Sequence, residues 1–534
     1  MSEAALHGRV DEIRAQSDAL EPGDQVGLER CEKALQRLGQ AHLIPSIVVD
    51  VAVRWQDMSL AERGLSLSGL EFDAAADGQV RACVAYNAFN AAVTCCRLTV
   101  RLQRSDEYAR FANSRERWIG LAHRHAPEAR REERVAFRTN LACDYITRGR
   151  FPEAIDQAHD ALAEDPEHPI ALAALGRAAL RWTELRLMAT RPPRALVVEA
   201  LLSAERTLRV ACGQPDRTRE AGYDGTHAHH KAWHDRALLV IEAVVGQSVE
   251  ATEREHEPYA EHLRAARIPT TVQRWREAGL DLRSLPISGG CAEHAGDVLQ
   301  LRQATRVAGE SAAAVSTDGD ASGRSIITAS LNAAREDYVV ARRLYLEATD
   351  ERRTIATAFT RFDPAPGSAH DEELGMLKAA LRLAFDAVDK LGVALNQHWE
   401  FGLATRDVSF HKVIGKRRAP SQRGPGNTLP SAQNPWFDAL DELERSLVGF
   451  RNPGGETTVD TTTATAPTIR EHRNAATHRY VSIRADGATT LAPSLTRNEL
   501  RILTLDALRV ARSAIQYTCF GLDHDLQLRL SSGA

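Results

Sequence analysis

The stretch that decides the fold is NLACDYITRGRFPEAIDQAHDALAEDP, which runs from Asn140 to Pro166. Small residues recur in it at helical spacing, so two antiparallel helices can approach each other closely. Gly149 allows the turn between the helices, and Pro166 ends the second one. The pattern recurs 34 residues later, at Leu175 and Gly176. The segment therefore predicts helical hairpins that repeat along the chain.

This spacing resembles the tetratricopeptide repeat (TPR), a stacked helical hairpin. The earlier segment AYNAFNAAVTCCRL (Ala85–Leu98) is interpreted as a further, more divergent repeat helix. A single isolated hairpin would carry the same pattern, and this alternative stays open. The residues that match the packing positions are Leu141, Ala142, Tyr145, Gly149, Ala154, Ala158, Ala161 and Pro166.

The composition is that of a folded protein, with 43% hydrophobic and 26% charged residues among 534. The net charge of −5 excludes polyanion binding by bulk electrostatics, so any nucleic-acid site has to be local. We expect a cytoplasmic protein without a membrane span, because no apolar run is long enough and the charged start has no signal core. Eight cysteines without a CxxC pair argue against zinc and disulfides, and we expect no metal or cofactor.

The C-terminal part shows strong helical periodicity after a small, polar stretch, Gln303–Thr328, which is interpreted as a linker. Four amphipathic helices are expected, enough for one bundle, with surface loops at 416–434 and 452–467 between them. Thr496 and Glu499 form a capping box at the start of the last helix. The predicted helices contain residues 331–345, 374–399, 436–450 and 496–517.

These patterns together predict an all-α protein in four parts. A TPR-like helical repeat array precedes a C-terminal helical bundle. The predicted boundaries are 1–130 for divergent repeat-like helices, 131–250 for TPR repeats, 251–326 for a connecting helical segment and linker, and 327–534 for the bundle.

The segment TIREHRNAATHRY (Thr468–Tyr480) combines Arg473, Asn474 and His478. On a helix, Asn474 and His478 share a face, whereas Arg473 is turned about 100° from Asn474. One helix therefore cannot easily aim Arg473 and His478 at the same atom. Two copies that face each other across a two-fold axis could form a composite site, so we expect a homodimer through the bundle.

Arg–Asn, three residues and then His, set in a four-helix bundle, resembles the HEPN superfamily of RNases and nucleotide-binding domains. The blocks Leu331–Ala348, Leu381–Leu403 and Arg406–Gly415 look like the core of a bacterial LA-type HEPN subfamily with TPR repeats in front. Val272–Pro286 looks like the segment that joins the two halves there. The sequence departs from the pattern at His472 and Ala476, where an apolar and an acidic or bulkier residue are expected.

The resemblance implies metal-independent cleavage of RNA by a defence or toxin effector, with the repeats sensing or holding a protein or peptide partner. His478 would act as general base or acid, because imidazole titrates near neutral pH. Arg473 would grip the scissile phosphate with two donors, and Asn474 would orient His478 or bind RNA. Arg470 and Arg479 are expected to contact the RNA beside them.

A basic stretch, His411–Asn427, is interpreted as a loop that contacts the RNA backbone through Lys416, Arg417, Arg418 and Arg423. A merely solvated loop is the alternative. The histidine-rich stretch 227–234 lacks a carboxylate or Cys at ligand spacing and is a weak metal candidate. The competing function is a non-catalytic adaptor, in which the repeats bind a protein and the bundle only dimerises or binds a nucleotide.

Overall fold

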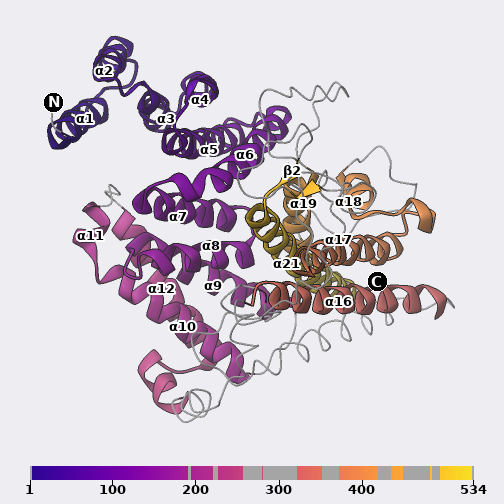
Figure 1. The fold of residues 1–534 in the computed structure, drawn as a ribbon. Helices are drawn as coiled ribbons and strands as arrows, with labels where there is room; N and C mark the ends of the chain where they lie inside the picture. Colours follow the sequence, from indigo (N-terminus) through magenta and orange to yellow (C-terminus); the bar gives the residue numbers. More distant parts are fainter. Residues whose placement is uncertain are drawn as a thin grey trace. The chain divides into compact units, whose positions relative to one another are not determined.

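The computed structural model describes residues 3–189, 194–220, 226–256, 280, 321–350, 372–418, 434–448, 482–483 and 494–531. The chain divides into two compact units, Met1–Asp144 with Val448–Thr468 and Tyr145–Leu447 with Ile469–Ala534. The described residues are helical (Figure 1), apart from turns and one parallel two-residue pair, β1 (Ser482–Ile483) and β2 (Ser494–Leu495). This confirms the predicted all-α class. Among the described residues, no helix is long and apolar enough to cross a membrane.

The first unit consists of α-helices packed on a core of aliphatic side chains and cysteines. Asp24, Asp57 and Asp77 begin three of these helices, because their carboxylates accept backbone N–H groups that have no partner inside the helix. Asp57 accepts from Ser59 N at 2.8 Å, and Asp77 accepts from Val80 N at 3.0 Å. The helices are α1 (Glu3–Asp18), α2 (Gln25–Arg37), α3 (Ile44–Trp55), α4 (Met58–Ala74), α5 (Gly78–Arg101), α6 (Ser105–His125) and α7 (Arg131–Thr147).

The hairpin predicted from the repeat pattern has the expected elements. Helix α7 ends at Thr147, Gly149 has a left-handed φ of +71°, and α8 (Phe151–Glu164) begins two residues later. Arg150 N donates to Tyr145 O at 2.8 Å and closes the turn. The small residues Ala154, Ala158 and Ala161 are fully buried. These helices and their turn confirm the local prediction, and the assignment of the array as TPR stays a prediction.

The second unit continues with α9 (Pro169–Ala189), which packs along α10 (Arg194–Cys212). Gly176 permits this contact, because a Cβ atom there would lie 2.6 Å from Leu208 Cγ. Gly176 is thus a close-approach position, as the repeat pattern predicts. Helix α10 packs in turn on α12 (Thr226–Val245), and the short α11 (Pro215–Glu220) contacts both α9 and α12.

The bundle also lies in the second unit, and its four predicted helices are confirmed. In it, α16 packs along α17, and α21 packs on both. Gly521 lets the Phe437 ring lie against α21, because a Cβ atom there would come within 2.4 Å of the ring. The helices are α16 (Ala321–Ala348), α17 (Glu372–His398), α18 (Phe410–Arg418), α19 (Pro435–Val448) and α21 (Arg497–Ser531).

Two predicted boundaries were wrong. Helix α16 begins at Ala321, inside the predicted linker 303–328, since Ile327 is buried and extends the apolar stripe of the helix toward its N-terminus. Helix α18 occupies the start of the stretch 411–427 that was interpreted as a loop. Its residues Phe410, Val413 and Ile414 are at helical spacing and buried, so this segment contributes to the core.

Leu280 is the one described residue of the stretch Val272–Pro286, and it contacts the bundle. Leu280 is fully buried, and its carbonyl oxygen accepts hydrogen bonds from Tyr338 Oη at 2.6 Å and Arg342 Nη1 at 3.0 Å. Both donors belong to α16 and are themselves buried. Leu280 therefore packs on α16 of the bundle.

Candidate functional site

The predicted catalytic and RNA-contacting residues fall into two groups. Those of the Arg–Asn–x3–His segment lie outside the described residues, and so does Arg423. Arg418 belongs to α18, but its side chain is not described. Lys416 and Arg417 are described. The residues outside are Arg470, Arg473, Asn474, His478 and Arg479.

The helix that follows the motif begins where the capping box predicts. Thr496 N donates to Glu499 Oε2 at 2.6 Å, and Glu499 N donates to Thr496 Oγ1 at 3.2 Å. This reciprocal pair satisfies two backbone donors at the start of α21. The capping box thus sets the start of α21, the helix that follows the Arg–Asn–x3–His segment in the sequence.

Lys416 and Arg417 on α18 make contacts within the protein. Lys416 Nζ donates to Phe401 O at 2.6 Å and lies 5.3 Å from the centre of the Phe401 ring. Arg417 pairs with Asp441 and, at 3.1 Å, with Asp438 Oδ1. The guanidinium also lies 5.8 Å from the Trp399 ring centre.

These contacts reduce the positive charge that Arg417 on α18 can present to RNA. The Arg417 side chain is only 11% exposed, and two carboxylates neutralise its charge. A guanidinium held in this way stabilises the junction of α18 with α19, but it has little free charge for a phosphate. The RNA contact predicted for this stretch therefore has less support at Arg417 than the sequence suggests.

A buried polar network lies near the same end of the bundle. Asn434 is fully buried and caps α19, because its Oδ1 accepts from Trp436 N at 3.1 Å. Its Nδ2 donates to Asp525 Oδ1 at 2.6 Å, and the other oxygen of Asp525 lies 3.2 Å from His398 Nε2. The network joins α17, α19 and α21. His398 is only 10% exposed, so we interpret the network as structural.

A second buried network joins α8 to α21, within the second unit. Arg512 and Asp156 form a two-point ion pair, with Nη2–Oδ2 at 2.6 Å and Nη1–Oδ1 at 3.2 Å. One turn toward the C-terminus of α8 and toward the N-terminus of α21, Arg509 Nη1 lies 3.2 Å from Asp160 Oδ2. In the other direction, Tyr517 Oη donates to Glu153 Oε2 at 2.6 Å. We call these three pairs the α8–α21 ladder.

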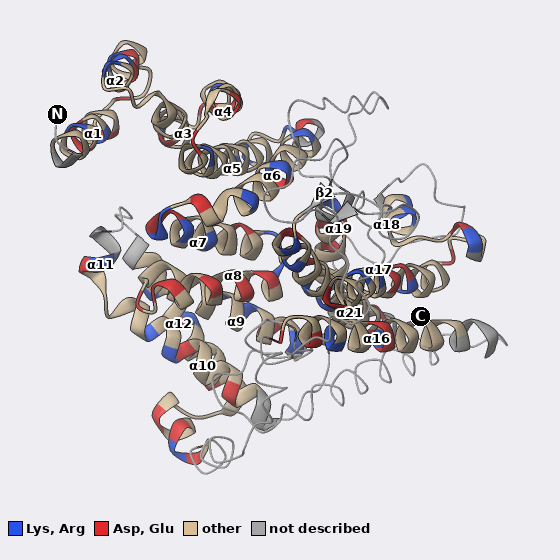
Figure 2. Ribbon diagram, in the orientation of Figure 1, with Lys and Arg blue, Asp and Glu red and all other residues tan. Residues whose placement is uncertain are grey.

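The ladder follows from helix geometry. Glu153, Asp156 and Asp160 are three and four residues apart and so lie on one face of α8. Their partners run in the opposite direction along α21, which places successive turns of two antiparallel helices side by side. Figure 2 shows acidic residues along α8 and basic residues on α21. The ladder shows that the repeat-like helix α8 is bound directly to the last helix of the bundle.

Aromatic side chains extend this junction to α9 and α19. The Trp182 ring lies 5.0 Å from the Trp436 ring and 5.7 Å from the Phe520 ring, both in edge-to-face geometry. Arg186 lies 3.5 Å over the Phe520 ring. Burial lowers the pKa of Arg186 to about 9, which reflects how completely water is excluded here.

Charge at the edge of the ladder depends on pH. Asp506 lies near Arg509 and Asp160, and burial raises its pKa to about 6, because the attraction of Arg509 offsets only part of the desolvation. Burial likewise raises the pKa of Tyr517 well above its usual value, so Tyr517 stays a hydrogen-bond donor to Glu153.

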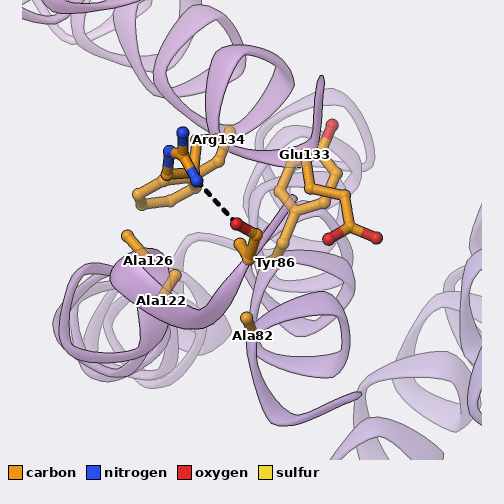
Figure 3. Close-up of a pocket in the computed structure, with 8 residues that line it drawn as sticks. Ala82, Tyr86, Ala122, Ala126, Glu133 and Arg134 are labelled. Atoms are coloured by element: carbon orange, nitrogen blue, oxygen red, sulfur yellow. Dashed lines mark hydrogen bonds between the residues drawn. The ribbon is translucent and has the colours of Figure 1, made fainter. Parts of the chain in front are cut away.

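Neither the histidine-rich helix nor a hollow in the first unit forms a candidate catalytic site. His234 Nε2 on α12 lies 2.9 Å from Glu205 Oε1, but no group of three or more His, Cys, Asp or Glu in the described part of the chain could hold a metal ion. The hollow has a volume of about 10 Å³, room for about one water molecule. Figure 3 shows it, with the hydrogen bond of 2.6 Å from Arg134 Nη1 to Ala129 O. Its lining residues are Ala82, Tyr86, Ala122, Ala126, Ala129, Glu133, Arg134 and Phe137.

The comparison with protein families finds one similarity, and it lies in the bundle. Residues 319–525 match the model of the LA2681-like HEPN family. The match begins just before α16 and ends within α21, so it covers α16 to α19, most of α21 and also the segment with Arg473, Asn474 and His478. It does not extend to α1–α12, and no family match supports the TPR assignment. No curated protein and no solved structure matches the chain.

The α8–α21 ladder was missed by the sequence interpretation. A signal was present, because Glu153, Asp156 and Asp160 are carboxylates at helical spacing beside the alanines that pack the hairpin. Their partners stand about 350 positions away, and helical periodicity alone gives no reason to pair the two segments.

Proposed function

We propose that the chain is a metal-independent endoribonuclease of the HEPN type. The observation that carries the proposal is the family match over residues 319–525, which contains the Arg–Asn–x3–His segment between α19 and α21. The second unit supplies the matching bundle. We further propose a cytoplasmic defence or toxin effector whose repeat region binds a protein or peptide partner.

The proposed chemistry is an attack of the ribose 2′-oxygen on the adjacent phosphorus. His478 accepts the 2′-hydroxyl proton as the new O–P bond forms, and the bond from phosphorus to the 5′-oxygen breaks. The 5′-oxygen receives a proton, and a cyclic phosphate remains on the other product. Arg473 stabilises the charge on the phosphate oxygens with two parallel donors, and Asn474 orients the imidazole.

The proposed active form is a homodimer. If this segment is helical, Arg473 and His478 cannot easily reach the same atom from one copy, so we propose that the partner copy contributes to each site. Arg470 and Arg479 would contact the RNA beside the motif. Since Arg417 is neutralised by two carboxylates, the proposed RNA contact of the basic stretch depends more on Lys416, Arg418 and Arg423.

The test is the incubation of a labelled RNA with the purified protein in EDTA, beside Arg473→Ala and His478→Ala. Cleavage by the wild-type protein that leaves a cyclic phosphate, and that both variants lose, supports the proposal. Equal cleavage by all three proteins would contradict it. A protein that remains a monomer in light scattering at micromolar concentration, yet cleaves RNA, would contradict the homodimer.

The adaptor is the second candidate, in which the repeats bind a protein and the bundle only dimerises or binds a nucleotide. The neutralisation of Arg417 favours it, because an RNA-binding helix would leave this charge free. The same assay decides between the two: an adaptor gives no cleavage in EDTA with any RNA, and the motif variants behave like the wild type.

A further inference from the structure

A cationic face with an indole at its centre lies on two helices of the second unit, away from the α8–α21 ladder. On α9 it contains Arg177, Arg181 and Glu184. On α12 it contains His229, Trp233 and Arg236. The members of each set are four and then three residues apart, so each set forms one stripe along its helix. We call these six residues the Trp233 face.

The two stripes meet around the indole of Trp233. Arg177 Cζ lies 5.2 Å and Arg236 Cζ 5.7 Å from the centre of the Trp233 ring, within the range of cation–π attraction. Arg236 Nε donates to Glu184 Oε1 at 2.8 Å, and Arg181 Nη1 donates to Glu184 Oε2 at 2.6 Å. One carboxylate from α9 thus holds guanidinium groups from both helices around the indole.

The charge of this face is opposite to that of the chain. Arg181 and Arg236 share the Glu184 carboxylate, two positive groups for one negative group, whereas the whole sequence has a net charge of −5. Glu184 is only 8% exposed, whereas Arg181 is 34% and Arg236 is 49% exposed. The positive ends therefore reach solvent, and the negative group lies beneath them. Figure 2 shows basic residues on α9 and α12.

His229 positions the indole rather than adding charge. Trp233 Nε1 donates to His229 Nε2 at 3.2 Å, which requires a neutral imidazole nitrogen as the acceptor. Partial burial and the neighbouring Arg177 lower the pKa of His229, so the imidazole is neutral at pH 7. The hydrogen bond fixes the orientation of the ring between the arginines.

We propose that the Trp233 face binds single-stranded RNA, at a site separate from the proposed catalytic segment. Guanidinium planes and a partly exposed indole are the groups on which unstacked bases lie, and the solvent-exposed parts of Arg181 and Arg236 would bind the phosphates between them. An acidic peptide would use the arginines but would have no need of an indole, so RNA accounts for more of the face. The inference deepens the proposed function, since it names the part of the repeat region that holds the RNA.

The experiment measures binding of a labelled oligouridylate of about 12 nucleotides by fluorescence anisotropy, a length within the range that single-strand sites occupy. The full chain carries His478→Ala, so that the RNA is not cut. Trp233→Leu removes stacking but keeps an apolar side chain, and it should weaken binding about tenfold or more. Trp233→Phe keeps an aromatic face and should restore most of the affinity.

A second pair of variants reports on charge. Arg181→Gln with Arg236→Gln should lower the slope of log K against log salt concentration by about 1.4, two phosphate contacts of about 0.7 each for a single strand. Arg206→Gln with Arg209→Gln on α10 is the matched control, because these arginines are 39% and 53% exposed and pair with Glu253. The control should leave both affinity and slope unchanged.

The inference is overturned if Trp233→Leu and the Arg181/Arg236 variant bind RNA like the parent protein. It is also overturned if a labelled hexaglutamate peptide binds in a Trp233-dependent way and RNA does not. Cleavage by the wild-type protein with Trp233-independent binding would refute this inference alone. Trp233-dependent binding without any cleavage would refute the proposed ribonuclease alone.

Discussion

Arg512→Met should destabilise the second unit strongly, although it only replaces one charged side chain with an apolar one of similar length. Arg512 and Asp156 are 4% and 8% exposed, and they are joined at 2.6 and 3.2 Å. The substitution leaves the Asp156 carboxylate buried without its two-point partner. Removal of one member of a buried pair lowers the unfolding free energy by about 3–5 kcal/mol, because the partner no longer offsets the desolvation of the remaining charge.

The double variant Arg512→Met with Asp156→Leu separates this cost from the value of the pair. It removes both charges and fills the space with apolar groups, so its unfolding free energy should return to within about 1 kcal/mol of the wild type, or exceed it. Arg206→Met is the surface control. It breaks a pair with Glu253 that is 39% and 28% exposed, and it should cost less than about 1 kcal/mol.

The measurement is urea unfolding of each variant, followed by circular dichroism and by tryptophan fluorescence. Fluorescence is informative because Trp182 and Trp436 lie in contact at the junction of α8 and α9 with the bundle. If Arg512→Met costs no more than the surface control, the α8–α21 ladder does not stabilise the folded protein in solution. In that case the double variant has no pair energy to separate, and the repeat-like helices and the bundle would each be stable without the contacts between α8 and α21.

Three further predictions follow from the same contacts. A fragment of residues 321–534 should be insoluble or molten, because it exposes Trp436 and Phe520, whereas residues 145–534 should give a cooperative thermal transition by circular dichroism. Asp506→Asn should raise the unfolding free energy at pH 8 by about 1–3 kcal/mol and have little effect below pH 4, since a carboxyl group with a raised folded pKa loses stability as pH rises from about 4 to 6. Urea titrations at the two pH values check this, and equal gains at both would contradict it. Arg473→Lys should abolish RNA cleavage even though the charge is kept, because an ammonium cannot reproduce the two-point grip on phosphate, and a gel assay in EDTA with activity near wild type would contradict that role.

Much of the bundle could be predicted from the sequence, because its helices pack by repeated apolar stripes. Leu377, Leu381, Leu391 and Leu395 are fully or almost fully buried on α17, as their spacing predicts. The capping box at Thr496 is also a local pattern, and its two hydrogen bonds confirm it. Elements that a few neighbouring residues specify were therefore predicted well.

The parts that were missed depend on residues far apart in the chain. Helix α18 is short, and its basic residues dominate its composition, so its three buried apolar residues were outweighed in the interpretation as a loop. The contacts of Arg417 depend on carboxylates of α19, which only the fold brings near. Arg512 has a local sequence typical of a solvated helix position, and its burial follows from α8, which packs on it.

The α8–α21 ladder also limits how the repeat region can bind a partner. Glu153 and Asp156 face the bundle and are buried, so this side of α8 is not available to another molecule. Trp182 and Arg186 on α9 are buried against the bundle in the same way. On another part of α9 and on α12, Arg181 and Arg236 keep 34% and 49% of their surface in solvent. A ligand that binds the second unit at its repeat-like helices should therefore meet a cationic face around Trp233, whether or not the repeats are those of the TPR family.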